Sequence, residues 1–255
     1  MPPETRQEPR WPSMVAPLAT ALALLAIWQA IVSFATLPPF ILPGPVRVAG
    51  ALWDNTGLIA FHAWITLLEV LVGIVIGAVL GAATALHLAT SPLARRLVRP
   101  ALVLTQALPV FALAPILTLW LGYGLWSKIV MAVLIIYFPV ASAFFDGLMR
   151  TPPGWLDLAR AMQATRRQVL WRIRVPAALP ALASGLRLAA VYAPIGAIIG
   201  EWVGASQGLG YLMLLANGRA KIDLMFAALL VLAVMTLLLH KIVGWGCDRL
   251  LARLG

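Results

Sequence analysis

The sequence contains few charged residues and one cysteine. Only 11 % of its 255 residues are charged, whereas a soluble domain carries about 25 %. Hydrophobic residues account for 62 %, which is more than one small core can bury. Lipid must therefore be the solvent for much of the surface. The composition predicts an all-α, polytopic membrane protein, because helices satisfy their backbone hydrogen bonds internally.

Missing motifs exclude several classes of function. A single cysteine, Cys247, excludes an intrachain disulfide and a cysteine-based metal cluster, and the three histidines lie far apart in the sequence. No Gly-Lys pair occurs, so the chain has no P-loop with which to bind ATP. It also lacks H-E-x-x-H and G-x-S-x-G, which argues against an intramembrane enzyme. We expect no metal and no cofactor in this chain.

The hydrophobic residues form six segments, each near the roughly 20 residues that cross a bilayer. We expect about six transmembrane helices, at residues 13–35, 63–90, 101–121, 128–149, 178–200 and 224–246. The chain then divides into a cytoplasmic tail (1–12), a first transmembrane helix (13–35), an external segment (36–62), a five-helix core (63–246) and a cytoplasmic C-terminal tail (247–255).

Basic residues predict the orientation, because cytoplasmic loops carry an excess of Lys and Arg. With the N-terminus inside, 13 of the 19 Lys and Arg residues fall in the cytoplasmic segments 1–12, 91–100, 150–177 and 247–255. The external segments hold four: Arg47, Lys128, Arg219 and Lys221. The net charge of +10 thus indicates cytoplasmic loops beside membrane lipid, and we expect no nucleic-acid partner.

Small residues recur on one face of the second span. Gly73, Gly77 and Gly81 are spaced by four residues, and Ala85 continues the series. Residues at this spacing form a line along a helix, where another backbone can approach closely. The pattern predicts tight helix packing and says nothing about a solute.

Prolines interrupt the middle spans. Pro109 and Pro115 fall in the third span, Pro139 in the fourth and Pro194 in the fifth. Each removes a helical hydrogen bond, and in lipid the freed carbonyls are tolerated only where protein or water satisfies them. Broken helices of this kind favour a transport path, and kinks that serve packing alone are the alternative.

An arginine-rich loop, residues 150–177, separates the fourth and fifth spans and holds six arginines. Thr151 followed by two prolines predicts the start of a short helix. Thr165 and Gln168 fit a capping box that opens a second short helix, which we expect Pro176 to stop. The loop is either an interfacial helix on anionic lipid or a docking surface for a soluble partner.

This loop resembles the EAA loop of permease subunits in ATP-binding cassette (ABC) importers. The family pattern is Glu-Ala-Ala, three residues, Gly, nine residues, Ile, one residue and Leu-Pro. The matching positions keep the full spacing and read Asp157-Leu158-Ala159, Gln163, Ile173 and Val175-Pro176. The resemblance implies that the loop sits in a groove of a cytoplasmic ATPase and transmits the closing of its nucleotide sites. Ala164 and Val169 belong to the same implied coupling surface.

Two positions depart from the family pattern. Asp157 replaces the usual glutamate, which keeps the charge and shortens its reach. Gln163 replaces a glycine, which would allow a left-handed turn between the two short helices at low cost. A non-glycine residue there costs roughly 1 kcal/mol, so either the turn differs or the loop carries that strain.

The resemblance extends over about residues 40 to 255. The stretches LPGPVRVAGAL, ALPVFALAPILTLWLGYGLWSKI and SGLRLA resemble permeases for nitrate, sulfonates and taurine. The stretches APIGAIIGEWVGASQGLGYLML and DLMFAALLVL are similar to permeases for the thiamine pyrimidine precursor, hydroxymethylpyrimidine.

Polar residues inside the spans are candidates for the translocation path, because a charged residue at a helix centre costs about 2.5–3.5 kcal/mol. Glu69 lies four residues before Gly73 and should face the bundle, where it would either favour a neutral or cationic solute over an anion or form an internal salt bridge. Arg187 could snorkel, cap the loop or contact solute. Glu201 opens a glycine-rich turn that we expect in the outer gate or in a docking face. The remaining candidates are Gln106, Tyr137 and Tyr192.

The resemblance implies the membrane-spanning subunit of an ABC importer in a bacterial cytoplasmic (inner) membrane. Its implied partners are a cytoplasmic ATPase that binds the ATP, a periplasmic or lipid-anchored solute-binding protein, and a second copy of the chain. The expected solute is a thiamine pyrimidine precursor, and nitrate, taurine or alkanesulfonates are the alternative. A gradient-driven secondary transporter that uses Glu69 as its ion site is the alternative of another class.

Overall fold

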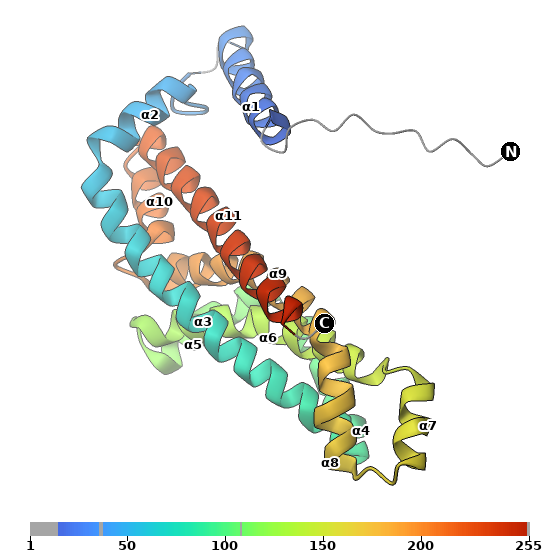
Figure 1. Cartoon of the computed structure of the whole chain (residues 1–255). Coiled ribbons are helices and arrows are strands. Elements are labelled where there is room, and N and C mark those ends of the chain that lie inside the picture. Colours follow the sequence, from blue (N-terminus) through green and yellow to red (C-terminus); the bar gives the residue numbers. More distant parts are fainter. Residues whose placement is uncertain (1–14, 36–37, 108, 254–255) are drawn as a thin grey trace, which may run out of the picture.

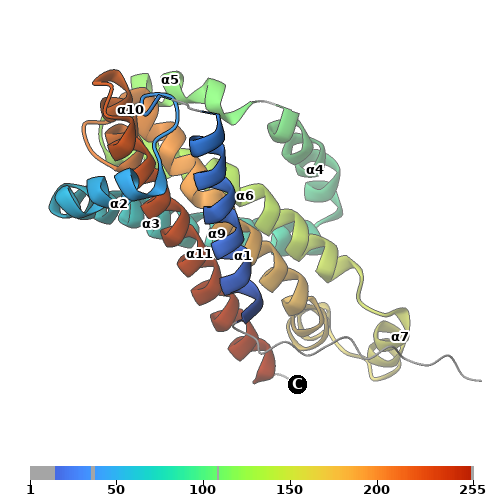
Figure 2. The same cartoon turned by 90° about the horizontal axis from the view of Figure 1, so that it is seen from above.

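The computed structural model describes residues 15–35, 38–107 and 109–253, and within them every regular element is a helix. The elements are α1 (Val15–Phe34), α2 (Pro45–Asp54), α3 (Thr56–Thr90), α4 (Pro92–Ala107), α5 (Val110–Leu121), α6 (Leu125–Met149), α7 (Pro153–Ala161), α8 (Arg166–Val169), a π-helical turn η1 (Leu170–Arg174), α9 (Val175–Gly204), α10 (Leu209–Gly218) and α11 (Ile222–Ala252). Figures 1 and 2 both place α7 at the opposite end of the bundle from α2 and α10.

Four helical runs among the described residues are long and apolar enough to cross a membrane: Thr56–Thr90, Leu125–Met149, Arg166–Gly204 and Ile222–Ala252. Shorter apolar helices, among them α5 and α10, accompany them. The predicted all-α membrane architecture is therefore confirmed. The second span begins at Thr56 and includes residues that we assigned to the external segment.

The predicted third span, 101–121, is not one continuous helix. Its residues divide between α4 and α5, and Pro109 is the N-cap of α5. Proline has no N–H to donate to the preceding turn, and its ring clashes with the carbonyl four residues earlier. Pro115, Pro139 and Pro194 lie inside helices that continue through them.

Helix α6 is held closely between α3 and α9. A Cβ added at Gly73 would lie 2.8 Å from Ala132 Cβ, and one added at Gly81 would lie 3.0 Å from the Tyr137 carbonyl oxygen. From the other side, a Cβ at Gly196 would lie 2.7 Å from Ala132 Cα. The glycine line of α3 therefore faces α6, as predicted, and α9 presents a second line of small residues to the same helix.

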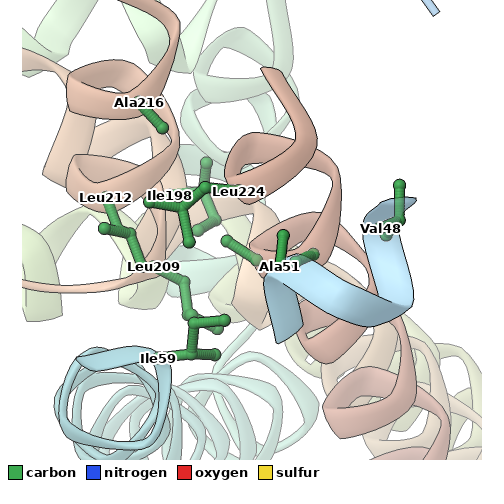
Figure 3. Close-up of a cluster of buried hydrophobic side chains, with 10 residues drawn as sticks. Val48, Ala51, Ile59, Ile198, Leu209, Leu212, Ala216 and Leu224 are labelled. Carbon is green, nitrogen blue, oxygen red and sulfur yellow. The ribbon is translucent and has the colours of Figure 1, made fainter. Parts of the chain in front are cut away.

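The end of the bundle at α2 is closed by a hydrophobic cluster, which Figure 3 shows. Ile59 of α3 and Ile198 of α9 meet Leu209 and Leu212 of α10 there. Val48 and Ala51 of α2 and Leu224 of α11 complete the contact. Because Leu209 is fully buried, the start of α10 lies inside the bundle.

The helix that opens at Arg166 does not stop at Pro176, contrary to prediction. It runs without a break from Arg166 to Gly204, through the π-helical turn Leu170–Arg174. A π-turn shifts the hydrogen-bonded partner by one residue, so the chain accommodates a proline that has no N–H to donate. The arginine-rich loop is thus joined to the fifth span by continuous helix.

Gly73→Leu should destabilise the bundle more than Gly57→Leu. Ala132 has no side-chain rotamer that could make room for the new side chain, so α3 and α6 must separate. Overpacking of this kind costs about 1–3 kcal/mol or more. Gly57 is the matched control, because it lies on the same helix with no atom within 4 Å of an added Cβ. Melting temperatures in detergent measure the difference, and equal values would contradict the packing argument.

Candidate functional site

The first short helix of the arginine-rich loop begins later than predicted. Pro152 is its N-cap and Pro153 its first residue, whereas Thr151 is buried and donates its hydroxyl to the Leu148 carbonyl at 3.1 Å. Thr151 therefore satisfies the end of α6 and does not cap α7. Proline suits both positions in α7, because the first N–H groups of a helix have no internal partner.

The turn after α7 carries the strain that the glycine-to-glutamine departure suggested. Gln163 has a φ of 55°, in the left-handed region, where a residue other than glycine costs roughly 1 kcal/mol. The Gln163 N–H donates to the Arg160 carbonyl, and the Ala164 N–H donates to the Ala159 carbonyl, both at 2.9 Å. This is a Schellman ending, so the turn keeps the geometry that glycine would give.

The predicted capping box at the start of the second helix is confirmed. The Gln168 N–H donates to Thr165 Oγ1 at 3.3 Å, and the Thr165 N–H donates to Gln168 Oε1 at 2.8 Å. These reciprocal bonds satisfy two backbone donors that the helix itself cannot.

The loop presents an apolar groove of about 510 Å³ between α7 and the start of α9. Leu158 is 62 % exposed and Met162 is 73 % exposed, and both line it. Its other lining residues are Trp155, Ala159, Arg172, Ile173, Pro176 and Ala177. Exposed apolar side chains beside arginines suit a protein contact better than bulk water.

The other residues predicted for the loop differ in accessibility. Asp157 is exposed and forms an ion pair with Arg160 on its own helix. Val169 and Ile173 are half-buried, and Ala159 is buried. The loop's accessible apolar face therefore lies on α7, at Leu158 and Met162, more than on the second helix.

A buried ion pair lies between α3 and α6. Lys128 Nζ is 3.3 Å from Glu69 Oε1, and the two side chains are 6 % and 0 % exposed. Glu69 faces the bundle, as predicted, but its partner Lys128 was expected in an external segment. That assignment is wrong, because α6 begins at Leu125 and carries Lys128 into the packed interior.

Glu201 is also buried, at 1 % exposure, so its side chain does not belong to a docking face, and its place in an outer gate stays a prediction. Its Oε1 accepts a hydrogen bond from the Thr66 hydroxyl at 2.6 Å, and its Oε2 accepts one from the Gly210 N–H at 2.5 Å. The Leu209 N–H donates to Thr66 Oγ1 at 2.8 Å. Glu201 therefore joins α3 to the first turn of α10.

The remaining path candidates are dispersed. Arg187 forms an ion pair with Asp248 on α11 at 2.5 Å, and both side chains are partly exposed. The Tyr137 hydroxyl donates to Thr84 Oγ1 at 2.9 Å between α6 and α3. Tyr192 is exposed on α9. Gln106 lies in α4, and its side chain is outside the part of the chain that the structure describes.

Three buried polar residues near Glu69 and Glu201 were not predicted for the site. His62 and Thr66 were not singled out, and Lys128 was placed in an external segment. The Gly208 N–H donates to His62 Nδ1 at 3.0 Å, so His62 holds the same turn as Thr66. A signal was available, because His62, Thr66, Glu69 and Gly73 follow the spacing of one helix face.

Comparison with known proteins places most of the chain in one family. The family model described as "Binding-protein-dependent transport system inner membrane component" matches residues 73–254. Over 236 residues the chain is 48 % identical to a "Probable ABC transporter permease protein" of Haemophilus influenzae, covering 92 % of this chain and 96 % of that protein.

Two further relatives have more specific names. The chain is 39 % identical over 191 residues to the "Formylaminopyrimidine transport permease protein ThiX" of Halalkalibacterium halodurans, covering 74 % and 76 % of the two chains. It is 36 % identical over 261 residues to the "Riboflavin transport system permease protein RibX" of Chloroflexus aurantiacus, covering 98 % and 97 %.

A solved structure has the same fold. A chain of the MetNI methionine ABC transporter, in an inward-facing conformation, matches with a TM-score of 0.66 and 22 % identity. The match covers 79 % of this chain and 98 % of that one. The likeness confirms the predicted permease fold.

Lys128→Met should destabilise the protein far more than Arg187→Met. The first change leaves Glu69 buried without its partner, at a cost of about 3–5 kcal/mol. The second breaks a partly exposed pair worth about 0–1 kcal/mol. Adding Glu69→Gln to Lys128→Met should recover part of the loss, because the buried charge is then removed. Unfolding midpoints in detergent decide this, and equal losses in the two single variants would contradict it.

Proposed function

This chain belongs to the binding-protein-dependent transport system inner membrane component family, and we propose that two copies of it form the solute path of an ATP-driven importer. It is an ABC permease subunit and not itself an enzyme. The observation that carries the proposal is the arginine-rich loop, which presents an exposed apolar groove at one end of a membrane bundle.

The loop is suited to transmit force from a cytoplasmic ATPase. Its exposed residues Leu158 and Met162 are available to a partner, and its second helix continues as the membrane-spanning α9. A displacement of the loop is therefore transmitted along a continuous helix and is not absorbed by a flexible linker. In this proposal both chain ends and the loop face the cytoplasm, as the excess of arginines there favours.

The external partner in this proposal is a solute-binding protein, which delivers its solute to the end at α2 and α10. The family description supports such a partner. Arg47, Lys221, Asp54 and Asp223 line a hollow of about 320 Å³ between α2 and α11 at that end. Charges of both signs on an accessible surface suit a reversible protein contact.

For the solute we propose a small nitrogen heteroaromatic, with a thiamine pyrimidine precursor as first choice. Support comes from the relatives named for formylaminopyrimidine and riboflavin, which are both compounds of this kind. The charge argument that Glu69 would repel nitrate or a sulfonate does not hold. Glu69 is buried, and Lys128 Nζ lies 3.3 Å from its Oε1, so it presents no exposed carboxylate to a passing anion.

The same ion pair removes the main support for a gradient-driven transporter. An ion site needs a group that can exchange its ion with water, and neither member of this pair is more than 6 % exposed.

Leu158→Asp combined with Met162→Asp should abolish association with the ATPase and leave the chain in the membrane. Both side chains are exposed, so the change removes apolar contact area without disturbing the packed interior. Trp171→Asp is the matched control, because Trp171 is exposed in the same segment and does not line the groove. Co-purification of the tagged ATPase is the measurement. An undiminished complex in the double variant would show that α7 is not the docking element.

Expression of this permease with its ATPase and binding protein should let a thiamine-requiring host grow on formylaminopyrimidine. The Leu158→Asp and Met162→Asp double variant serves as the uncoupled control. Growth that depends on the intact permease supports the proposed solute. Permease-dependent uptake of taurine or nitrate without pyrimidine rescue would contradict the proposed solute class, and uptake of riboflavin alone would contradict the first choice. Each of these outcomes leaves the importer assignment in place.

A further inference from the structure

The turn between α9 and α10 is irregular backbone set back from the outer end of the bundle. It lies level with Thr66, ten residues after α3 begins at Thr56, which corresponds to about 15 Å along the helix. Helix α10, also ten residues long, runs from this turn back toward α2 (Figure 1). At membrane depth, non-helical backbone is tolerated only when it is buried in protein or lines water.

The turn is held by side chains on three consecutive backbone N–H groups. Gly208 donates to His62, Leu209 to Thr66 and Gly210 to Glu201, at distances of 2.5 to 3.0 Å. These are the first free N–H groups of α10, which carry the partial positive charge of a helix N-terminus. The Glu201 carboxylate is thus held by the start of α10 and by Thr66, beside the Glu69 and Lys128 pair.

Two glycines make this contact possible. Gly208 has a φ of 110°, and a Cβ there would overlap the Glu201 carboxylate. A Cβ at Gly210 would lie 2.9 Å from Glu201 Oε2. The carboxylate is therefore enclosed by the backbone of the turn.

The tip of the turn is exposed, whereas the N–H groups at its end are buried. Ser206 and Gln207 are exposed, between the buried Gly204 and Gly208. Neither of their side chains hydrogen-bonds to another group in residues 15–35, 38–107 or 109–253. Amide and hydroxyl groups without a protein partner are costly to place in lipid, which favours a watery surrounding for these two side chains.

We propose that the Ala205–Gln207 turn lines the aqueous path, that Gln207 hydrogen-bonds the passing solute, and that Glu201 is the positioning residue that holds the turn there. This rests on the proposed importer function. An amide offers a donor and an acceptor side by side, which matches the ring nitrogen and amino group of an aminopyrimidine. A nitrogen heteroaromatic is the solute class that such a group recognises.

A cysteine reporter tests the placement without any solute or nucleotide. Ser206→Cys is made in a Cys247→Ser background, which removes the chain's one cysteine. A membrane-impermeant maleimide should label it from outside intact cells. Gly154→Cys on α7, where an added Cβ meets open space, should be labelled in inverted vesicles alone.

The hydrogen bonds that Thr66 and Glu201 make to the turn are tested on the same reporter. Glu201→Gln and Thr66→Val should each change the labelling rate at position 206 by about tenfold, because a hydrogen bond to a charged group is lost. Thr66→Val keeps the volume of the side chain and removes its hydrogen bonds to Glu201 and to the Leu209 N–H, so it tests these contacts even if Glu201→Gln folds poorly. Thr56→Val is the matched control, because it removes a hydroxyl from the same helix that contacts only carbonyls of α2. It should leave the rate unchanged.

Uptake of formylaminopyrimidine supplies the functional readout. Gln207→Ala and Glu201→Gln should raise KM about tenfold with little change in maximal rate, whereas Thr56→Val should change neither. A purely structural role for Glu201 would lower the maximal rate with the amount of folded protein and leave KM unchanged.

Several results would overturn the inference. They are no labelling at position 206 from outside, or equal labelling rates in the Thr66→Val and Thr56→Val proteins. An unchanged KM in the Gln207→Ala protein would overturn the solute contact. If the unmodified permease imports no pyrimidine, the proposed solute fails, and the labelling rates still decide where the turn lies.

Discussion

The close approach of α3 and α9 to α6 is the constraint on which the rest of the structure depends. Ala132 is contacted from one side at Gly73 and from the other at Gly196, so neither neighbour can slide without a clash. This register also aligns the charges. Glu69 lies one turn before Gly73 and Lys128 one turn before Ala132, so the helix contact that excludes larger side chains brings the ion pair together. In a medium without water, packing of small residues supplies the association that the hydrophobic effect supplies elsewhere.

The buried charges are compensated locally, and this ties the elements into one body. Glu69 is paired with Lys128, and Glu201 is paired with the backbone N–H groups at the start of α10. Leaving either carboxylate without its partner in a low dielectric is strongly unfavourable. The three helices α3, α6 and α9, together with α10, are therefore expected to move together. The continuous helical run from Arg166 to Gly204 has the arginine-rich loop at one end and Glu201 near the other. In the proposed importer, that run is the direct mechanical link between the ATPase and the turn at Gln207.

Local signals in the sequence predicted local structure well. The glycine spacing of α3, the capping box at Thr165 and the position of the left-handed turn at Gln163 each depend on a few neighbouring residues. Two local rules failed. Pro176 did not end its helix, because a π-helical turn absorbed the missing N–H, and Thr151 bonded backward to α6 instead of forward to α7. In both cases the backbone just before the residue offered an alternative: a wider helical turn for Pro176 and a free carbonyl at the end of α6 for Thr151.

The sequence by itself determined the solvent, the approximate spans and the identity of the loop, because apolar length, charge asymmetry and motif spacing are properties of the chain alone. The tertiary structure decided which polar groups are partners. Lys128 was expected outside and is buried against Glu69, while Glu201 was expected in an outer gate or a docking face and is enclosed by α10. Lys128 is far from Glu69 in the sequence, and Glu201 meets Thr66, 135 residues away, as well as the nearby start of α10. Spacing within one helix can show that a charge faces inward, but only the packing of the helices shows what it meets there.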